Sequence, residues 1–137
     1  MSGPFTTEEA ARVAEFRAAL RRFLRITERN ARTARLTPQR YLLLMIKGAA
    51  DHSERSTVTE LAERLQLAQS TVTELVRRAE EIGLVERERS AVDGRIAHLR
   101  LTPEGERRLA EAFTSNDSER RALLEAFESL QGHVTAG

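Results

Sequence analysis

Polar and basic side chains gather in one short stretch of the chain, residues 69–78, on the outward side of a helical pattern. Hydroxyl, amide and guanidinium groups hydrogen-bond to phosphate oxygens and base edges, whereas a helix without a partner needs only solubility. A solvated surface is the plainer interpretation for any such helix taken alone. The side chains that we expect to contact a nucleic acid in this stretch are Gln69, Ser70, Thr71, Thr73, Glu74, Arg77 and Arg78.

Glu74 carries the most specific expectation of this group. A carboxylate in a major groove is repelled by phosphates, but it can accept a hydrogen bond from the exocyclic amine of cytosine. The alternative is that Glu74 pairs with Arg77 or Arg78, which stand three and four residues further along the helix. Both interpretations stay open on the sequence alone.

A β-hairpin is predicted just after this helix. Residues 84–87 and 96–101 alternate roughly as half-buried strands, and residues 90–94 between them are turn-rich. Because a hairpin tip reaches furthest from the body of a protein, Arg95 could enter a minor groove, with Asp93 bonding the turn or orienting an arginine. The alternative is an ordinary solvated tip residue, paired loosely with Asp93. Arg87 and Arg89 of the first strand complete the basic candidates.

Two short helices must position these side chains. Thr57 and Glu60 stand at the spacing of a capping box, so the first helix is predicted to begin near Thr57. Its buried stripe consists of Val58, Leu61, Ala62 and Leu65. Residues 67–69 form a turn, and Gly83 ends the second helix, whose buried stripe consists of Val72, Leu75, Val76, Ala79 and Ile82. Two helices joined by so short a turn predict a helix-turn-helix.

The combination of motifs resembles the MarR family of winged-helix regulators, named for multiple antibiotic resistance. The resemblance rests on Ser70-Thr71-Val72-Thr73, Gly83-Leu84-Val85 with Arg87, Asp93-Gly94-Arg95, and Leu101-Thr102-Pro103-Glu104-Gly105. It implies a homodimer that binds palindromic double-stranded DNA and is released by a small aromatic effector. The family often has a basic residue where this chain has Glu74, and a capping Ser or Asp where it has Ala68. The base preference is therefore not transferable.

Helices are predicted on both sides of the winged helix. Thr7 is expected to cap a long first helix, where Ala10 leaves no full capping box. Thr37-Pro38 begins a helix that is apolar almost all round, so this helix is expected to be central and buried. The helix after Pro103 is interrupted at residues 114–118, several turns earlier than in the family, and residues 132–137 are expected to fray. The apolar faces need a partner, and the side chains assigned to dimerisation are Val13, Phe16, Leu20, Leu123, Phe127 and Leu130.

Composition excludes several other classes of protein. The 137 residues contain no cysteine, which excludes disulfides and thiol chemistry, and His52, His98 and His133 have no triad or metal-ligand spacing. We therefore expect no enzyme, metal or cofactor. The net charge of +1 gives no global field for nucleic acid. No apolar run approaches the length of a membrane span, and no cleavable leader is visible, so a cytoplasmic location is expected.

The predicted fold class is mainly α, an α+β winged helix with N- and C-terminal dimerisation helices. One domain is expected over residues 1–137: a first helix at 7–35, the winged helix-turn-helix at 37–102 and dimerisation helices at 103–131. The predicted function is transcriptional repression. The alternative is a winged-helix module that holds a protein partner without reading DNA, since fold does not decide function.

Overall fold

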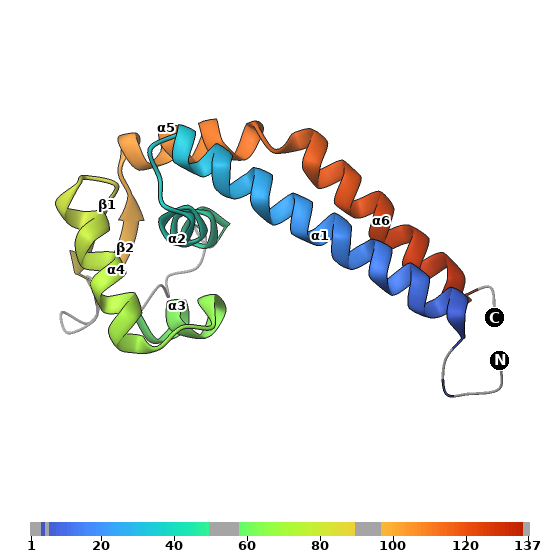
Figure 1. The fold of residues 1–137 in the computed structure, drawn as a ribbon. Coiled ribbons are helices and arrows are strands. Elements are labelled where there is room, and N and C mark those ends of the chain that lie inside the picture. The colour runs from blue at the N-terminus through green and yellow to red at the C-terminus, as the bar shows by residue number, and fades with distance from the viewer. Residues whose placement is uncertain (1–3, 5, 50–57, 90–96, 136–137) are drawn as a thin grey trace. The chain divides into compact units, whose positions relative to one another are not determined.

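The computed structural model describes residues 4, 6–49, 58–89 and 97–135, and it is mainly helical. Its elements, shown in Figure 1, are α1 (Thr7–Thr33), α2 (Pro38–Ala49), α3 (Val58–Leu65), α4 (Gln69–Glu81), β1 (Val85–Arg89), β2 (Ala97–Leu101), α5 (Pro103–Thr114) and α6 (Asp117–Thr135). β1 and β2 pair antiparallel with Val85 opposite Leu101. The predicted fold class is confirmed. No helix among the described residues is both long enough and apolar enough to cross a membrane.

Contacts divide the chain into two compact units. The first contains residues 1–30 and 113–137, and the second contains residues 31–112. In the first unit α1 and α6 run antiparallel, and the rings of Phe16 and Phe127 lie 6.1 Å apart between their centroids. The second unit holds α2, α3, α4, the two strands and most of α5, so the segment predicted as a winged helix lies within it.

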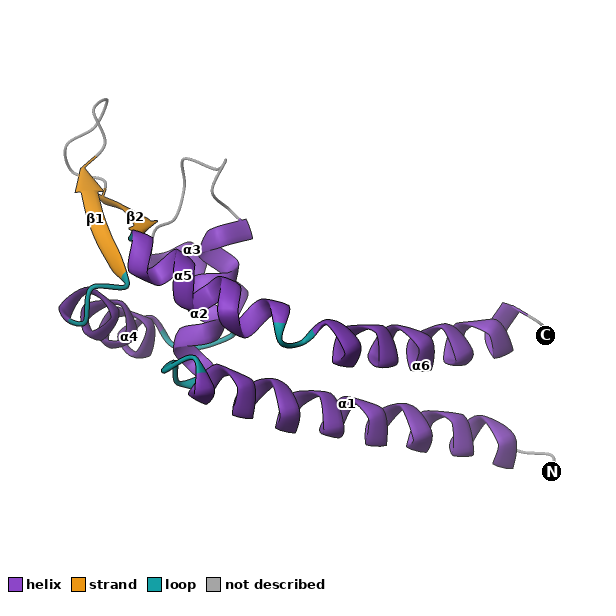
Figure 2. Cartoon of the chain, turned by 90° about the horizontal axis from the view of Figure 1, so that it is seen from above, coloured by secondary structure: helices purple, strands orange, loops and turns teal. Residues whose placement is uncertain are grey.

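The core of the second unit is formed by the apolar stripes of its helices. Leu61 and Ala62 of α3 are buried, as are Val72, Leu75, Val76 and Ala79 of α4. Figure 2 shows the two strands beside α4. The buried side chains of this hairpin and of the residue before it are Leu84, Val85, Leu99 and Leu101. Val58 and Leu65 are half-buried against this core, and the predicted stripes of the helix-turn-helix are otherwise confirmed with one exception. Ile82 is 44% exposed, because α4 ends at Glu81 and the chain turns away at Gly83.

Helix α2 contributes Tyr41, Leu43 and Leu44 to the core, which confirms its predicted central place. Leu42 departs from the prediction of an apolar helix buried almost all round, since it is 41% exposed. Lys47, the only lysine of the chain, is 4% exposed in the last turn of the same helix. A charged side chain is rarely buried to this degree, so its burial shows how fully this end of α2 is enclosed.

The start of α1 differs from the prediction by one residue. Thr6, and not Thr7, caps the helix: the Glu9 N–H donates to the Thr6 hydroxyl at 3.0 Å, and the Thr6 N–H donates to the Glu9 carboxylate at 3.0 Å. These two bonds form a full capping box, which satisfies two N–H groups that a helix start leaves free. The predicted absence of a box, based on Ala10, was wrong because the spacing was counted from the wrong threonine.

The junction between the hairpin and α5 is built on two glycines and a threonine. Gly83 has a φ of +77°, the left-handed conformation predicted at the end of α4. The Thr102 hydroxyl accepts the Gly105 N–H at 3.0 Å, which confirms Thr102 as the cap of α5, and it also donates to the Gly83 carbonyl. A Cβ at position 105 would lie 2.1 Å from the Leu84 carbonyl oxygen. Only glycine fits this close approach.

The predicted interruption after α5 is also present. Asn116 lies between α5 and α6 with 1% of its surface exposed, and its side-chain oxygen accepts a hydrogen bond from the Asn30 amide at 2.7 Å. The guanidinium carbon of Arg120 lies 3.8 Å from the centroid of the Phe113 ring. The expected fraying from residue 132 is wrong in part, because α6 continues to Thr135.

Candidate nucleic-acid interface

The outward side of α4 presents the polar side chains that the sequence singled out. Gln69, Ser70, Thr71 and Thr73 are all exposed, and they lie opposite the buried stripe of the helix. The helix begins at Gln69, within the segment predicted as a turn. Its N-cap residue, Ala68, makes no side-chain hydrogen bond. A helix start leaves backbone N–H groups free to bind an anion, and here no capping side chain competes for them.

Glu74 is held by two arginines of its own helix. The Arg77 guanidinium donates from Nε to Glu74 Oε2 at 2.9 Å and from Nη2 to Oε1 at 2.6 Å, and Arg78 Nε donates to Oε1 at 3.1 Å. Arg77 also pairs with Glu81. These contacts show the helical pairing that was one of the two interpretations of Glu74.

The same contacts set the electrostatics of this surface. Hydrogen bonds from Arg77, and then from Arg78, lower the pKa of Glu74 from 4.5 to about 2. The bond to Glu74 raises the pKa of Arg77 above its ordinary value. Both side chains are half exposed, so water and salt screen the attraction. The cluster is therefore fully charged at neutral pH, and Glu74 offsets part of the positive charge of its neighbours.

The hairpin carries further charged pairs. Arg87 of β1, 44% exposed, donates to Glu80 of α4 at 2.8 Å, and Arg100 of β2 donates to Glu88 of β1 at 3.1 Å. Arg87 is thus held beside the end of α4, and its predicted contact with nucleic acid stays a prediction. The side chain of Arg89 and the whole of Asp93 and Arg95 lie outside the described residues, so the predicted wing contact stays a prediction.

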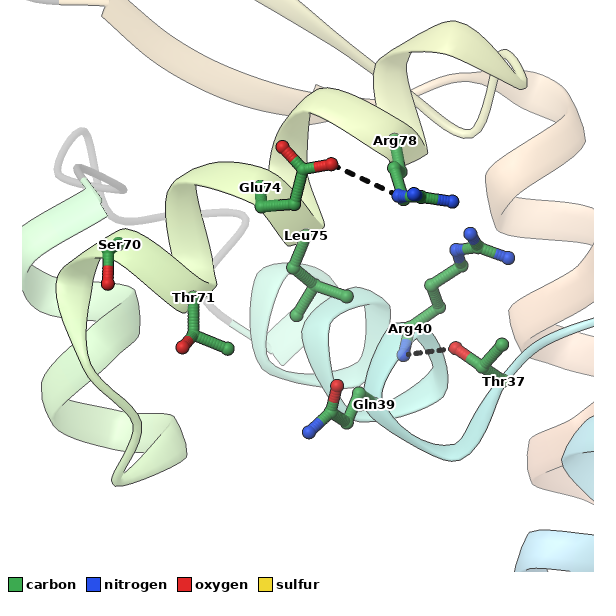
Figure 3. Close-up of a pocket in the computed structure, with 8 residues that line it drawn as sticks. All are labelled: Thr37, Gln39, Arg40, Ser70, Thr71, Glu74, Leu75 and Arg78. Carbon is green, nitrogen blue, oxygen red and sulfur yellow. Dashed lines mark hydrogen bonds and ion pairs between the residues drawn. The ribbon is translucent and has the colours of Figure 1, made fainter.

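An open groove of about 500 Å³ separates the start of α2 from α4. Figure 3 shows its lining, which consists of Thr37, Gln39, Arg40, Ser70, Thr71, Glu74, Leu75 and Arg78. Sequence reasoning found the four polar residues from α4 but missed the three from the start of α2. The available signal was Arg40, a basic side chain one turn into a helix capped by Thr37, where the Arg40 N–H donates to the Thr37 hydroxyl at 3.2 Å.

The side chains predicted to dimerise all lie on α1 and α6 of the first unit. Val13 and Phe127 are 48% and 43% exposed, and Leu124, which was not among them, is 55% exposed. The other predicted members, Phe16, Leu20, Leu123 and Leu130, are half-buried. This helix pair therefore retains apolar surface that one copy of the chain does not cover.

Comparisons with known proteins agree with this geometry. Residues 36–96 match the family model described as MarR family, which confirms the resemblance for the winged helix. The chain is 38% identical over 71 residues to an uncharacterised HTH-type transcriptional regulator, YsmB, of Bacillus subtilis. That match covers 52% of this chain and 49% of the relative, so the chain matches about half the length of that protein.

Solved structures of regulators share the fold. One is AbsC, a MarR family transcriptional regulator from Streptomyces coelicolor, with a TM-score of 0.72 and 21% identity over 98% of this chain and 93% of that one. Another is the M. tuberculosis transcriptional regulator MOSR in complex with DNA, with a TM-score of 0.54 and 26% identity over 88% of this chain and 77% of that one. The similarity to AbsC extends over nearly the whole chain.

Proposed function

We propose, from the MarR-family winged helix at residues 36–96, that this chain is a transcription regulator that binds double-stranded DNA through α4. The observation that carries the proposal is the outward side of α4. Its hydroxyl and amide groups are exposed, its N-cap offers no side-chain bond, and two adjacent arginines, Arg77 and Arg78, follow in the second half of the helix. A structural neighbour of the same fold is described in complex with DNA.

The proposed docking places α4 in the major groove. Its first residues, Ser70 and Thr71, then lie near phosphates or base edges, and Thr73 faces the bases. Arg77 and Arg78 supply positive charge along the helix, while Arg95 extends the contact toward the minor groove. We propose that Glu74 pairs with the two arginines and does not contact a base, because its carboxylate already accepts three hydrogen bonds from them.

We further propose that the DNA-binding form is a homodimer on a palindromic site. The uncovered apolar side chains of α1 and α6 support a second copy of the chain as their partner. Two copies related by a two-fold axis would place two α4 helices on half-sites about 10 base pairs apart. A repressor of this kind acts on the chromosome, so the proposal includes a cytoplasmic location.

The final part of the proposal concerns release from DNA. A small aromatic ligand that prefers a dimer with different spacing of the two α4 helices would lower the affinity for the operator. This step is supported by the family resemblance alone. A screen of phenolic and aromatic acids tests it, and a set that leaves DNA affinity unchanged counts against ligand release.

The experiment that tests the main proposal is selection of bound sequences from random duplex DNA. We expect enrichment of an inverted repeat, followed by salt-dependent retardation of that sequence on a gel. Failure to enrich any sequence, together with retention of a protein partner by the same surface, would favour the interaction module. The matched variant is Thr73→Val, which keeps the shape of an exposed side chain but removes its hydroxyl. It should lower the affinity for the selected sequence more than it lowers the affinity for unrelated DNA.

A further inference from the structure

The groove between α2 and α4 holds two arginines from different helices. Arg40 comes from the first turn of α2 and Arg78 from the second half of α4, and both line the same open space. Figure 3 shows their guanidinium groups next to each other. Two positive charges at close range repel, so this arrangement favours an anion between or beside them.

Arg40 is the less satisfied of the two arginines. Its Nε is buried and has no hydrogen-bond partner among the residues that the structure describes. A guanidinium group is always charged, and leaving one of its donors buried without an acceptor is costly. Arg78 differs in that its Nε donates to Glu74 at 3.1 Å, and Figure 3 shows the remaining nitrogens of its guanidinium group near Arg40. Within the part of the chain that the structure describes, the groove thus presents a buried guanidinium donor, Arg40 Nε, that no acceptor satisfies.

Neighbouring groups add donors of the right kind. Ser70 and Thr71 bring hydroxyl groups from the start of α4, and Gln39 brings an amide from the start of α2. An oxyanion with several acceptor oxygens fits the two adjacent guanidinium groups, because Arg matches the geometry of phosphate in particular. The only carboxylate in the lining, Glu74, is already bonded to Arg77 and Arg78.

We propose that this groove seats one phosphate of the DNA backbone, with Arg40 and Arg78 as its charged ligands. The inference rests on the proposed function, since it takes α4 to be the helix in the major groove. When α4 lies in the major groove, the DNA backbone that borders the major groove passes along the flank of α4, where α2 meets it. Such a contact positions the protein on the duplex and carries no base preference.

The test compares Arg40→Gln with the wild type on a selected operator and on an unrelated duplex at several salt concentrations. We expect a loss of about 5- to 10-fold on both sequences near 0.1 M salt, and a salt slope reduced by about one per protomer. Arg40→Lys should retain part of the affinity because it keeps the charge. Thermal unfolding of both variants verifies that they fold.

A matched control is Arg107→Gln. Arg107 is an arginine on α5 outside the groove, where it pairs with Glu104 at 2.6 Å. It should bind both duplexes like the wild type. Folded Arg40→Gln protein that binds like the wild type at every salt concentration overturns the phosphate contact, as does a loss confined to the operator.

The outcomes separate this inference from the proposed function. If the wild type binds no duplex at all, the proposed function fails and the backbone contact fails with it. If DNA binding is intact and indifferent to position 40, only the groove assignment fails. A third measurement is titration with inorganic phosphate alone. If Arg40→Gln loses phosphate binding while its DNA affinity stays unchanged, the groove is a site for a free anion, and the backbone contact is overturned.

Discussion

Arg77 clamps both carboxylate oxygens of Glu74, with donor–acceptor distances of 2.9 and 2.6 Å. A carboxylate held in this way keeps its negative charge on the surface that we propose meets DNA. Glu74→Gln should therefore strengthen binding to every sequence by a similar factor, about 3- to 10-fold at low salt, because it removes one negative charge near the phosphates. Binding measured on a panel of operator variants would show this. A changed preference at one base pair per half-site would instead mean that Glu74 contacts a base.

The lowered pKa of Glu74 gives a pH prediction with a definite sign. Because the folded-state pKa of about 2 lies below the ordinary value of 4.5, the pairing stabilises the folded state above pH 4.5. That stabilisation is lost as the pH falls from 4.5 toward 2. Titration of the side-chain carboxyl by NMR should give a midpoint well below 4.5 in the wild type and a higher one in Arg77→Gln, where Arg78 alone still lowers the pKa. Equal midpoints in the two proteins would show that the pair does not persist in solution.

Arg95 tests the contact proposed for the segment between β1 and β2, which lies outside the described residues. Arg95→Ala should leave folding and oligomeric state unchanged, because a solvated hairpin tip contributes little to stability. It should weaken operator binding by about 1–3 kcal/mol. Arg95→Lys should recover only part of this, since an ammonium group keeps the charge but loses the planar fork. Wild-type affinity of Arg95→Ala at several salt concentrations would remove the wing from the interface.

Gly105 should be the least replaceable glycine of the described chain. An added Cβ would lie 2.1 Å from the Leu84 carbonyl oxygen, so Gly105→Ala must shift α5 or the start of β1. We expect this substitution to lower the free energy of unfolding by about 1–3 kcal/mol. The control is Gly83→Ala, where nothing lies within 4 Å and the cost arises only from the positive φ, about 1–2 kcal/mol. Urea unfolding measures both. A Gly105→Ala protein as stable as the wild type would contradict this junction.

Leu124 tests the proposed homodimer. It is 55% exposed on α6, so Leu124→Glu should cost little within one chain while placing a charge in an apolar interface. Sedimentation at low micromolar concentration should show a dimer for the wild type and a monomer for this variant. Leu42→Glu, at 41% exposure on α2, is the matched control and should remain dimeric. A wild-type monomer would contradict both the dimer and the palindromic site.

Local pattern explains which parts of the fold could be predicted from the sequence. The stripes of α3 and α4, apart from Ile82, the left-handed Gly83 and the Thr102 cap were predicted correctly, because each depends on residues within a few positions of one another. The cap of α1 was missed by one residue, although the Thr6 to Glu9 spacing contains the signal. Ile82 was assigned to the core because periodicity does not show where a helix stops.

The candidate site required distances that spacing does not provide. Arg40 and Arg78 are far apart in the sequence, and only the packing of α2 against α4 makes them neighbours. The pairing of Glu74 was one of two interpretations allowed by helical spacing, and the actual side-chain geometry favours it. Whether Arg95 reaches DNA stays a prediction, since no contact of that residue is described.

The burial of Lys47 has a practical consequence for labelling this protein. It supplies the only side-chain amine of the chain, and with 4% of its surface exposed that amine is shielded while α2 stays packed. Reagents that attack primary amines should therefore modify the folded chain at its terminal amino group first. Appearance of a second modified site would report that α2 has opened. The rate at which Lys47 is modified would therefore measure how often α2 opens.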